Sequence, residues 1–474
     1  MKRGCAYTAS PHVHTGVLAA GAPGIARATL RQRALRAGGW SFAGYGLSQA
    51  IRLGSNLLMT RLLAPEMFGV IAIATMVTVI LGMLSDIGLQ QNIVQSRRGG
   101  DPAFLDTAWV VQIVRGGGLW LIALLLSAAL YFANLRGLFP AQSVYATPVL
   151  PPVIAASAFA AVIAGFASTK IASAYREFNQ RRVIQIEVIS QFAALAVMVV
   201  LGIATRSIWA LVAGGLVATL TATVLSHLWM DGIPNRFRIE RESLQELIGF
   251  GKWIFVSSAV GILAINGDRI LLGGYVDAHT LGLYAIAALI AGSIEGLLSR
   301  LFATVSLPAL SEVARNNPAG LRDIYYKLRI PSDLLLLFLA GLLFATGHWV
   351  IDLLYDSRYS AAGGMLQVLA LSLFTVRYGV AHQIYLAAGM PRYLAIINTV
   401  RFLSLFTVVP VLYYFAGLQA AIWGIALHGL ATLPFVYYFN AGLGLNDWRR
   451  ELIVLVALPV GFLCGDALTM LPIR

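Results

Sequence analysis

The sequence predicts an all-α integral membrane protein with about 12–14 transmembrane helices. Two six-helix lobes, related by an internal parallel repeat, are expected to make up most of it. Composition is the first observation behind this prediction, because 58% of the 474 residues are hydrophobic and only 12% are charged. Soluble chains average roughly 45–50% apolar and about 25% charged residues. Second, apolar runs of roughly 20 residues, the length that crosses a bilayer, recur from position 41 to the C-terminus. The third observation is the repeat itself.

Trp-anchored stretches of similar sequence occur twice along the chain. The corresponding pairs are Trp40 and Trp253, Phe68–Ala74 and Leu281–Ala287, and Trp209 and Trp423. The first two pairs are 213 positions apart and the last pair is 214 positions apart. A nearly constant interval over most of a lobe is typical of two copies of one fold. A site between the two copies is therefore the first place to look for function.

Hydropathy along the chain predicts six spans in each lobe. In the first lobe, residues 37–230, we expect helices near 41–63, 68–90, 108–132, 147–169, 183–204 and 207–229. In the second lobe, residues 250–440, we expect helices near 250–274, 281–308, 331–355, 361–388, 393–415 and 419–439. The C-terminal residues, 441–474, carry one more apolar stretch at 452–471. Because Pro459 and Asp466 weaken that stretch, it is expected to be either a thirteenth span or a re-entrant segment.

The segments outside the lobes are basic or charged. Residues 1–36 hold six Lys and Arg residues and no acidic residue, which predicts a disordered cytoplasmic tail. The Val17–Ala22 patch within them is too short for a signal-peptide core. Residues 231–249 are charged and fall between the repeats, so they are predicted to form a cytoplasmic linker, with an amphipathic interfacial helix as one form.

Loop charges predict the orientation of the chain. Alternate loops on one side carry 23 of the 34 Lys and Arg residues, whereas loops on the other side carry five. Cytoplasmic loops are enriched in Lys and Arg, so the N-terminus is predicted to be cytoplasmic. Basic loops that face anionic lipid explain much of the net charge of +13, so no nucleic-acid partner is expected. Cys5 and Cys464 have no Cys or His neighbours, and the sequence indicates no disulfide, metal site or cofactor.

Six arginines remain, all inside predicted spans, where a fixed charge costs at least ~2.5–3.5 kcal/mol on insertion scales. Four of them fall at or near the middle of the membrane: Arg52, Arg115, Arg377 and Arg401. We expect these four to line a hydrated cavity between the lobes. Because guanidinium groups form paired hydrogen bonds with phosphate oxygens, they predict an anionic substrate whose hydrocarbon tail stays in the bilayer.

The other charged groups inside spans have weaker indications. Arg269 and Arg300 fall near helix ends, where we expect secondary anion contacts, with ion pairing or snorkelling as the alternative. Glu295 is expected either to balance an arginine or to couple transport to a proton or cation. Asp86 falls near a cytoplasmic helix end, where capping or gate contacts are expected. Three histidines, His348, His382 and His428, are expected to be packed or hydrogen-bonded rather than to carry protons.

Several motifs of this chain resemble those of the bacterial polysaccharide transporter family. In the first lobe they are Trp40-Ser41-Phe42, Thr60–Gly69 (TRLLAPEMFG), Leu84–Leu89 (LSDIGL), Phe104–Trp109 (FLDTAW) and Arg115-Gly116. In the second lobe they are Gly267-Asp268-Arg269, Leu281–Tyr284 (LGLY) and Pro308–Ser311 (PALS). These O-antigen and exopolysaccharide flippases belong to the multidrug/oligosaccharidyl-lipid/polysaccharide exporter superfamily. The resemblance covers most of residues 40–440.

The resemblance implies a flippase without enzymatic activity. It would move an undecaprenyl-pyrophosphate-linked oligosaccharide from the inner to the outer leaflet of the bacterial inner membrane by alternating access. A glycan polymerase and chain-length machinery are implied as partners beside the bilayer. Basic central cavities in the family agree with the predicted cavity arginines.

Three alternatives stay open at the level of sequence. A lipid II-type flippase and a multidrug or cation antiporter would share the fold, but a cation antiporter should favour an acidic cavity. A membrane-embedded glycan polymerase or ligase is the more distant alternative. It usually needs an extramembrane catalytic loop, and the predicted periplasmic loops are short.

Overall fold

The structure, a computed structural model, describes residues 30–85, 88–177, 179–301, 306, 310–311, 313 and 320–470. Every regular element in these ranges is a helix, which confirms the predicted all-α class. The helices of the first half are α1 (Leu30–Leu62), α2 (Pro65–Leu84), α3 (Leu89–Gln95), α4 (Pro102–Leu135), α5 (Leu150–Gly165), α6 (Lys170–Arg176), α7 (Arg181–Thr205) and α8 (Trp209–Leu228).

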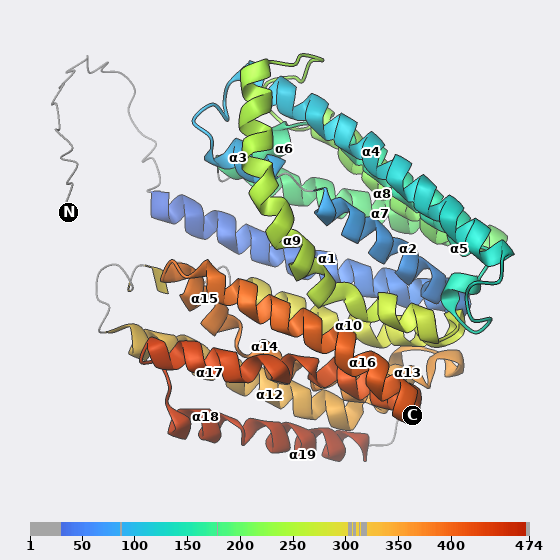
Figure 1. Ribbon diagram of the computed structural model, residues 1–474, viewed down its shortest axis with the longest axis vertical. Coiled ribbons are helices and arrows are strands. Elements are labelled where there is room, and N and C mark those ends of the chain that lie inside the picture. The colour runs from blue at the N-terminus through green and yellow to red at the C-terminus, as the bar shows by residue number, and fades with distance from the viewer. Residues whose placement is uncertain are drawn as a thin grey trace, which may run out of the picture.

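The second half continues in the same way. Its helices are α9 (Arg241–Tyr275), α10 (Ala278–Leu301), α12 (Leu321–Leu354), α13 (Ala362–Ala370), α14 (Leu373–Val376), α15 (Gly379–Ala387), α16 (Pro391–Leu427) and α17 (Leu433–Gly442), followed by α18 (Trp448–Val454) and α19 (Ala457–Thr469). Short 3₁₀ turns include η1 (Val144–Ala146), η4 (Ser357–Tyr359) and η5 (His428–Thr432). Figure 1 shows α2 to α8 in the upper part of the molecule and α10 to α19 in the lower part; α1 runs along the boundary, and α9 runs from the upper edge of the molecule down to it.

Local sequence explains where several helices begin and break. Pro65 and Pro102 occupy the first helical positions of α2 and α4, where a missing N–H is harmless. The Asp101 side chain caps α4 by accepting a hydrogen bond from the Ala103 amide at 3.0 Å. Gly417 interrupts α16 with φ 75° and ψ −167°, a positive-φ conformation that favours glycine. The two predicted spans at 393–415 and 419–439 are therefore separated by this break.

Helix length and hydropathy agree with a membrane protein. Among the described residues, nine helical segments are long and apolar enough to cross a bilayer, or ten when the bent pair α5–α6 counts as one. The segment Pro391–Gly442 is counted as one of these, although the break at Gly417 divides it into two helical parts. In addition, α1 and α9 are 33 and 35 residues long. The multi-pass helical class is therefore confirmed, and the predicted number of 12–14 spans stays a prediction.

The last apolar stretch forms part of the helical bundle. Trp448–Thr469 is 22 residues long, and α19 lies beside α12 (Figure 1). A Cβ on Gly341 would lie 2.0 Å from the Leu458 carbonyl oxygen, and a Cβ on Gly461 would lie 2.0 Å from that of Phe338. Glycines thus let the two backbones touch, as in close membrane helix pairs. This packing favours a thirteenth span over a re-entrant segment.

The linker differs from its expected form. Helix α9 begins at Arg241, inside the predicted 231–249 segment, so the charged residues after 240 belong to a long helix and not to a separate interfacial one. The residues before it are held against α4. The Arg236 amide donates to Asp106 Oδ1 at 2.8 Å, and the Glu240 amide donates to Thr107 Oγ1 at 2.9 Å.

The two halves meet where α2 packs against α10. A Cβ on Gly69 would lie 2.0 Å from the Ala278 carbonyl oxygen, and a Cβ on Gly282 would lie 1.9 Å from that of Pro65. The repeat interval of 213 residues separates Gly69 from Gly282, and it also separates Pro65 from Ala278. Each half therefore contributes the same two positions, which is the pattern of a two-fold, isologous contact. Glu66 and His279, whose Oε1 and Nδ1 atoms lie 2.9 Å apart, are also separated by 213 residues.

Further contacts join the halves at the same end of the molecule, which we call the closed end. Arg358 Nη2 donates to the Thr60 carbonyl oxygen at 2.7 Å, and Arg61 Nη2 donates to that of Leu354 at 3.2 Å. Each arginine thus caps the last turn of a helix in the opposite half. Hydrogen bonds from Arg358 also hold the pKa of Asp356 below its usual range. The closed end is therefore sealed by backbone contact and reciprocal arginine caps.

Replacing Gly69 by Leu should weaken the junction, because the added side chain would meet backbone that cannot yield without moving α10. We expect a loss of about 1–3 kcal/mol in stability, as for overpacked cores. Gly117→Leu is the matched control, since a Cβ at Gly117 has no heavy atom within 4 Å. Thermal unfolding of the purified protein in detergent compares the two. Equal unfolding temperatures for the two variants would contradict the proposed tight contact.

Candidate functional site

A cavity of about 400 Å³ lies in the second half, beside the junction with α2. Helices α9, α10 and α16 supply most of its wall. Its ionisable lining residues are Asp268, Arg269, Tyr284, Glu295, Arg401 and His428. The structure thus brings together three residues that sequence analysis singled out separately: Arg269, Glu295 and Arg401.

Arg269 reaches from this cavity to the first half. Its Nη1 donates to the Met76 sulfur on α2 at 3.5 Å. Thioether sulfur is a weak acceptor, so the other guanidinium donors are available to a ligand. Arg269 forms no ion pair with any residue that the structure describes, the adjacent Asp268 included. The expected ion pairing of Arg269 is therefore not what the structure contains.

Arg401 comes from α16, another helix of the cavity wall. Its Nε donates to His428 Nε2 at 3.2 Å, and His428 Nδ1 lies 2.6 Å from the Ile425 carbonyl oxygen. Within the described parts of the chain no carboxylate pairs with Arg401. Two guanidinium groups without a fixed counter-ion therefore share one cavity.

Two carboxyl groups lie in the same wall. Asp268 Oδ2 accepts a hydrogen bond from the Tyr284 hydroxyl, while its Oδ1 is buried and has no partner among the described residues. Glu295 is half-buried and forms no ion pair there. It does not directly neutralise an arginine, contrary to one expectation. Guanidinium groups suit phosphate oxygens, and carboxylates accept hydrogen bonds from hydroxyl groups, so this mixed wall can bind a sugar phosphate.

Arg377 is a correction to the expected cavity lining, because its side chain is only 2% exposed. Its Nη2 lies 3.0 Å from Glu451 Oε2, and Arg329 Nε lies 3.0 Å from Asp333 Oδ2. Arg329 also pairs with Glu451. Two guanidinium and two carboxylate groups therefore neutralise one another in the interior of the second half. Arg377 has no access to a substrate in this arrangement.

This buried cluster of Arg329, Asp333, Arg377 and Glu451 joins α12 and the α14–α15 turn to α18. Arg329 is not among the predicted site residues, because the span is predicted to start at 331, whereas α12 begins at Leu321. The spacing of Arg329 and Asp333, four residues apart, is the signal that could have revealed a helical ion pair. Glu451 is too distant in sequence to be paired with Arg377 by inspection.

Three other predicted residues lie elsewhere. Arg52 is exposed on α1 and has no hydrogen bond or ion pair within the described ranges. The Arg300 guanidinium lies 5.6 Å from the centre of the Tyr45 ring, near the end of α10. Asp86 falls outside the described residues.

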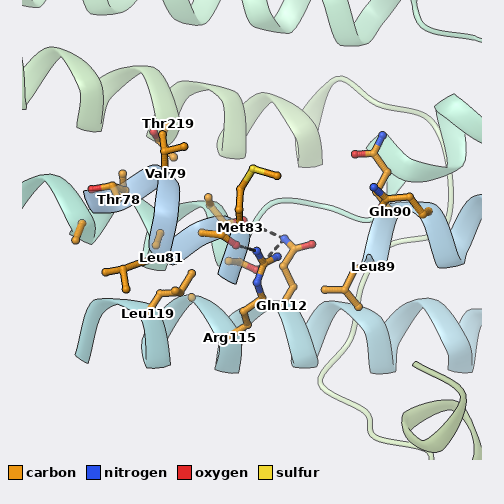
Figure 2. Close-up of a pocket in the computed structure, with 18 residues that line it drawn as sticks. Thr78, Val79, Leu81, Met83, Leu89, Gln90, Gln112, Arg115, Leu119 and Thr219 are labelled. Atoms are coloured by element: carbon orange, nitrogen blue, oxygen red, sulfur yellow. Dashed lines mark hydrogen bonds between the residues drawn. The ribbon is translucent and has the colours of Figure 1, made fainter. Parts of the chain in front are cut away.

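Arg115 lines a different cavity, of about 660 Å³, in the first half. Figure 2 shows its guanidinium rising from α4 toward the end of α2, beside Gln112. It donates to the Gly82 carbonyl oxygen at 2.6 Å and to Ser85 Oγ at 3.0 Å. Arg115 thus holds the last turn of α2. The expected single cavity is replaced by separate locations for Arg52, Arg115, Arg377 and Arg401.

Comparisons with known proteins agree with this architecture. The sequence model of a family described as "Polysaccharide biosynthesis protein" matches residues 58–364. No curated protein sequence matches the chain.

Solved structures with a similar fold include a flippase and two transporter conformations. "Lipid II flippase MurJ, inward closed conformation" is 16% identical, with a TM-score of 0.68, over 91% of this chain and 93% of that one. An inward-facing "multidrug resistance MATE family transporter of the MOP superfamily" is 12% identical, with a TM-score of 0.64, over 90% and 94%. An outward-facing transporter described in the same words is 14% identical, with a TM-score of 0.52, over 92% and 95%. At these identities the likeness establishes the fold.

Replacing Glu451 by Gln should strongly destabilise the second half, because it leaves Arg329 and Arg377 with one carboxylate between them. Breaking a buried ion pair in this way costs about 3–5 kcal/mol. Glu295→Gln is the matched control, since it removes a carboxylate that has no ion-pair partner among the described residues. Thermal unfolding in detergent measures both variants.

The double variant Glu451→Gln with Arg377→Gln should regain part of the lost stability, because neighbouring charges do not act additively. A Glu451→Gln protein as stable as the Glu295→Gln control would show that the cluster does not hold α18.

Proposed function

Because the chain belongs to the polysaccharide biosynthesis protein family and has a multi-pass transporter fold, we propose that it is a flippase for a lipid-linked oligosaccharide. The cargo is an undecaprenyl-pyrophosphate-linked glycan, carried from the inner to the outer leaflet of a bacterial inner membrane. The likeness in fold to a lipid II flippase supports a lipid-linked cargo. The family supports a glycan.

One observation carries the choice of an anionic head group. Arg269 and Arg401 line one cavity beside the junction of the halves, and neither is ion-paired with a described residue. Keeping unpaired guanidinium groups at membrane depth is costly unless water or an anion solvates them. A diphosphate would satisfy both groups, while Asp268, Tyr284 and Glu295 would accept or donate hydrogen bonds to sugar hydroxyls.

Arg52 is proposed as a further contact, which the head group would meet on its way along α1. Its exposed side chain has no partner in the described structure. Arg115 and Arg300 have less support, since Arg115 holds the end of α2 and Arg300 lies over Tyr45.

The closed end supports alternating access. Loop charges predict that the N-terminus is cytoplasmic, which orients the closed end toward the periplasm and makes this conformation inward-facing. The higher TM-score to the inward-facing than to the outward-facing transporter, 0.64 against 0.52, supports this orientation. Release outward would require α2 and α10 to separate. The membrane potential favours outward movement of an anion by about 2.3 kcal/mol per charge per 100 mV.

A lipid II-type cargo is the second candidate, because it presents the same diphosphate and the same fold is used for it elsewhere. A cation antiporter fits less well, since both guanidinium groups would repel its cargo. The glycan that accumulates in a deletion strain separates the first two candidates.

Replacing Arg401 or Arg269 by Ala should reduce glycan transport, because each removes a charge-assisted hydrogen bond worth about 1.5–3 kcal/mol, or roughly 10- to 100-fold. Lys at either position should retain part of the activity. Arg52→Ala should have a smaller effect than either. Surface polysaccharide and membrane insertion are measured together. Arg136→Ala, at an exposed position after α4, is the control. Normal surface glycan in an inserted Arg401→Ala protein refutes the site.

Cysteine labelling tests the orientation. In a variant without Cys5 and Cys464, a cysteine at Asp277 before α10 should react with a membrane-impermeant reagent added outside the inner membrane. A cysteine at Asp447 before α18 should react only after the membrane is opened. The opposite pattern would reverse the proposed direction of transport.

A further inference from the structure

His428 lies at the C-terminus of α16, where its ring touches two groups of opposite hydrogen-bonding character. Nδ1 lies 2.6 Å from the Ile425 carbonyl oxygen, and Nε2 lies 3.2 Å from Arg401 Nε. A carbonyl oxygen can only accept, so Nδ1 must carry a hydrogen. A guanidinium can only donate, so Nε2 must present a lone pair. The two contacts together require a neutral imidazole protonated on Nδ1.

This tautomer fixes the position of Arg401. The lone pair of Nε2 orients the guanidinium Nε–H. The Ser404 hydroxyl donates to the His428 carbonyl oxygen at 3.1 Å, which fixes the backbone of His428. If Nε2 took up a proton, two cations would face each other at this distance, and the hydrogen bond would be lost. Arg401 would then be released into the cavity.

The charged groups around the ring have mixed signs. Arg401 approaches from α16, Asp268 and Arg269 from α9, and Glu295 from α10. Tyr284, also on α10, is the remaining titratable group in the wall. The charge of Arg401 also acts on His382 of α15. Burial and the charge of Arg401 oppose a positive charge on His428, whereas the Ile425 carbonyl oxygen and the Asp268 carboxylate favour it. In addition, a helix C-terminus favours a cation. The surroundings can therefore accommodate a charged His428 once Arg401 has turned to another partner.

We propose that His428 is the positioning residue for Arg401, and that anion binding in this cavity is linked to the uptake of one proton by His428. The inference rests on the proposed function, which supplies the anionic head group. As the anion draws Arg401 away, Nε2 loses its donor and binds a proton from water in the cavity. The new N–H then adds a second positive charge beside the anion.

The sign of the effect follows from the proton balance. Binding takes up a proton, so affinity for the anion rises as the pH falls. The structure confirms that His428 is hydrogen-bonded, as the sequence predicts, and the proposal adds that it takes up a proton when the anion binds. His428→Gln separates the two roles, since its carboxamide oxygen can accept from Arg401 but cannot be protonated.

The experiment measures binding of farnesyl diphosphate to the full-length protein in lipid nanodiscs by calorimetry. From about pH 7.5 to about pH 5.5 we expect the wild-type affinity to rise at least about fivefold more than that of His428→Gln. The comparison between proteins is needed because the diphosphate itself titrates. Calorimetry in buffers of different ionisation enthalpy should show that wild type takes up as much as one proton more than His428→Gln on binding.

Two controls complete the design. His227→Gln, on α8 in the first half, should keep the wild-type pH dependence, whereas His428→Leu should bind weakly at both pH values because Arg401 loses its acceptor. Nitrogen NMR of labelled histidine should report His428 protonated on Nδ1 at about pH 7.5 without any ligand.

The outcomes are distinguishable. Equal pH dependence in wild type and His428→Gln, or a His428 protonated on Nε2, overturns the linkage while the proposed function stands. A wild-type protein that fails to bind the probe at either pH overturns both.

Discussion

The backbone contact between α2 and α10 is the constraint on which the rest of this structure depends. It forms at Gly69 and Gly282, which occupy corresponding positions in the two halves, and it can form only because neither has a Cβ. The contact is two-fold in pattern, so the repeat in the sequence becomes a symmetric junction in space. Reciprocal caps by Arg61 and Arg358 reinforce it at the same end.

The location of the candidate cavity follows from this junction. Helices α9 and α10, which supply much of its wall, are also the helices of the second half that pack against α2. Arg269 therefore contacts Met76 across the boundary and also lines the cavity. A movement that separates α2 from α10 would also change the surroundings of Arg269. In this way opening of the closed end and release of a bound anion can be coupled through shared helices.

Much of the fold could be predicted from sequence, because a bilayer demands about 20 apolar residues per span and the repeat is visible in the motifs. The start of α9 at Arg241 could not, since a charged helix and a charged linker look alike in sequence. The position of Arg377 within a predicted span identifies it as an arginine at membrane depth, but it does not show which way the side chain points. Its neutralisation requires Glu451, which only packing of α18 brings near. By contrast, Arg269, Glu295 and Arg401 were found by charge, and packing supplied their common cavity.

The central claim is that the diphosphate of a lipid-linked glycan binds between Arg269 and Arg401. An electron cryomicroscopy structure of the protein with a short polyprenyl-diphosphate sugar tests it most directly. The account predicts phosphate oxygens within hydrogen-bonding distance of both guanidinium groups. Density for the diphosphate in the first-half cavity beside Arg115, or away from both arginines, would contradict it.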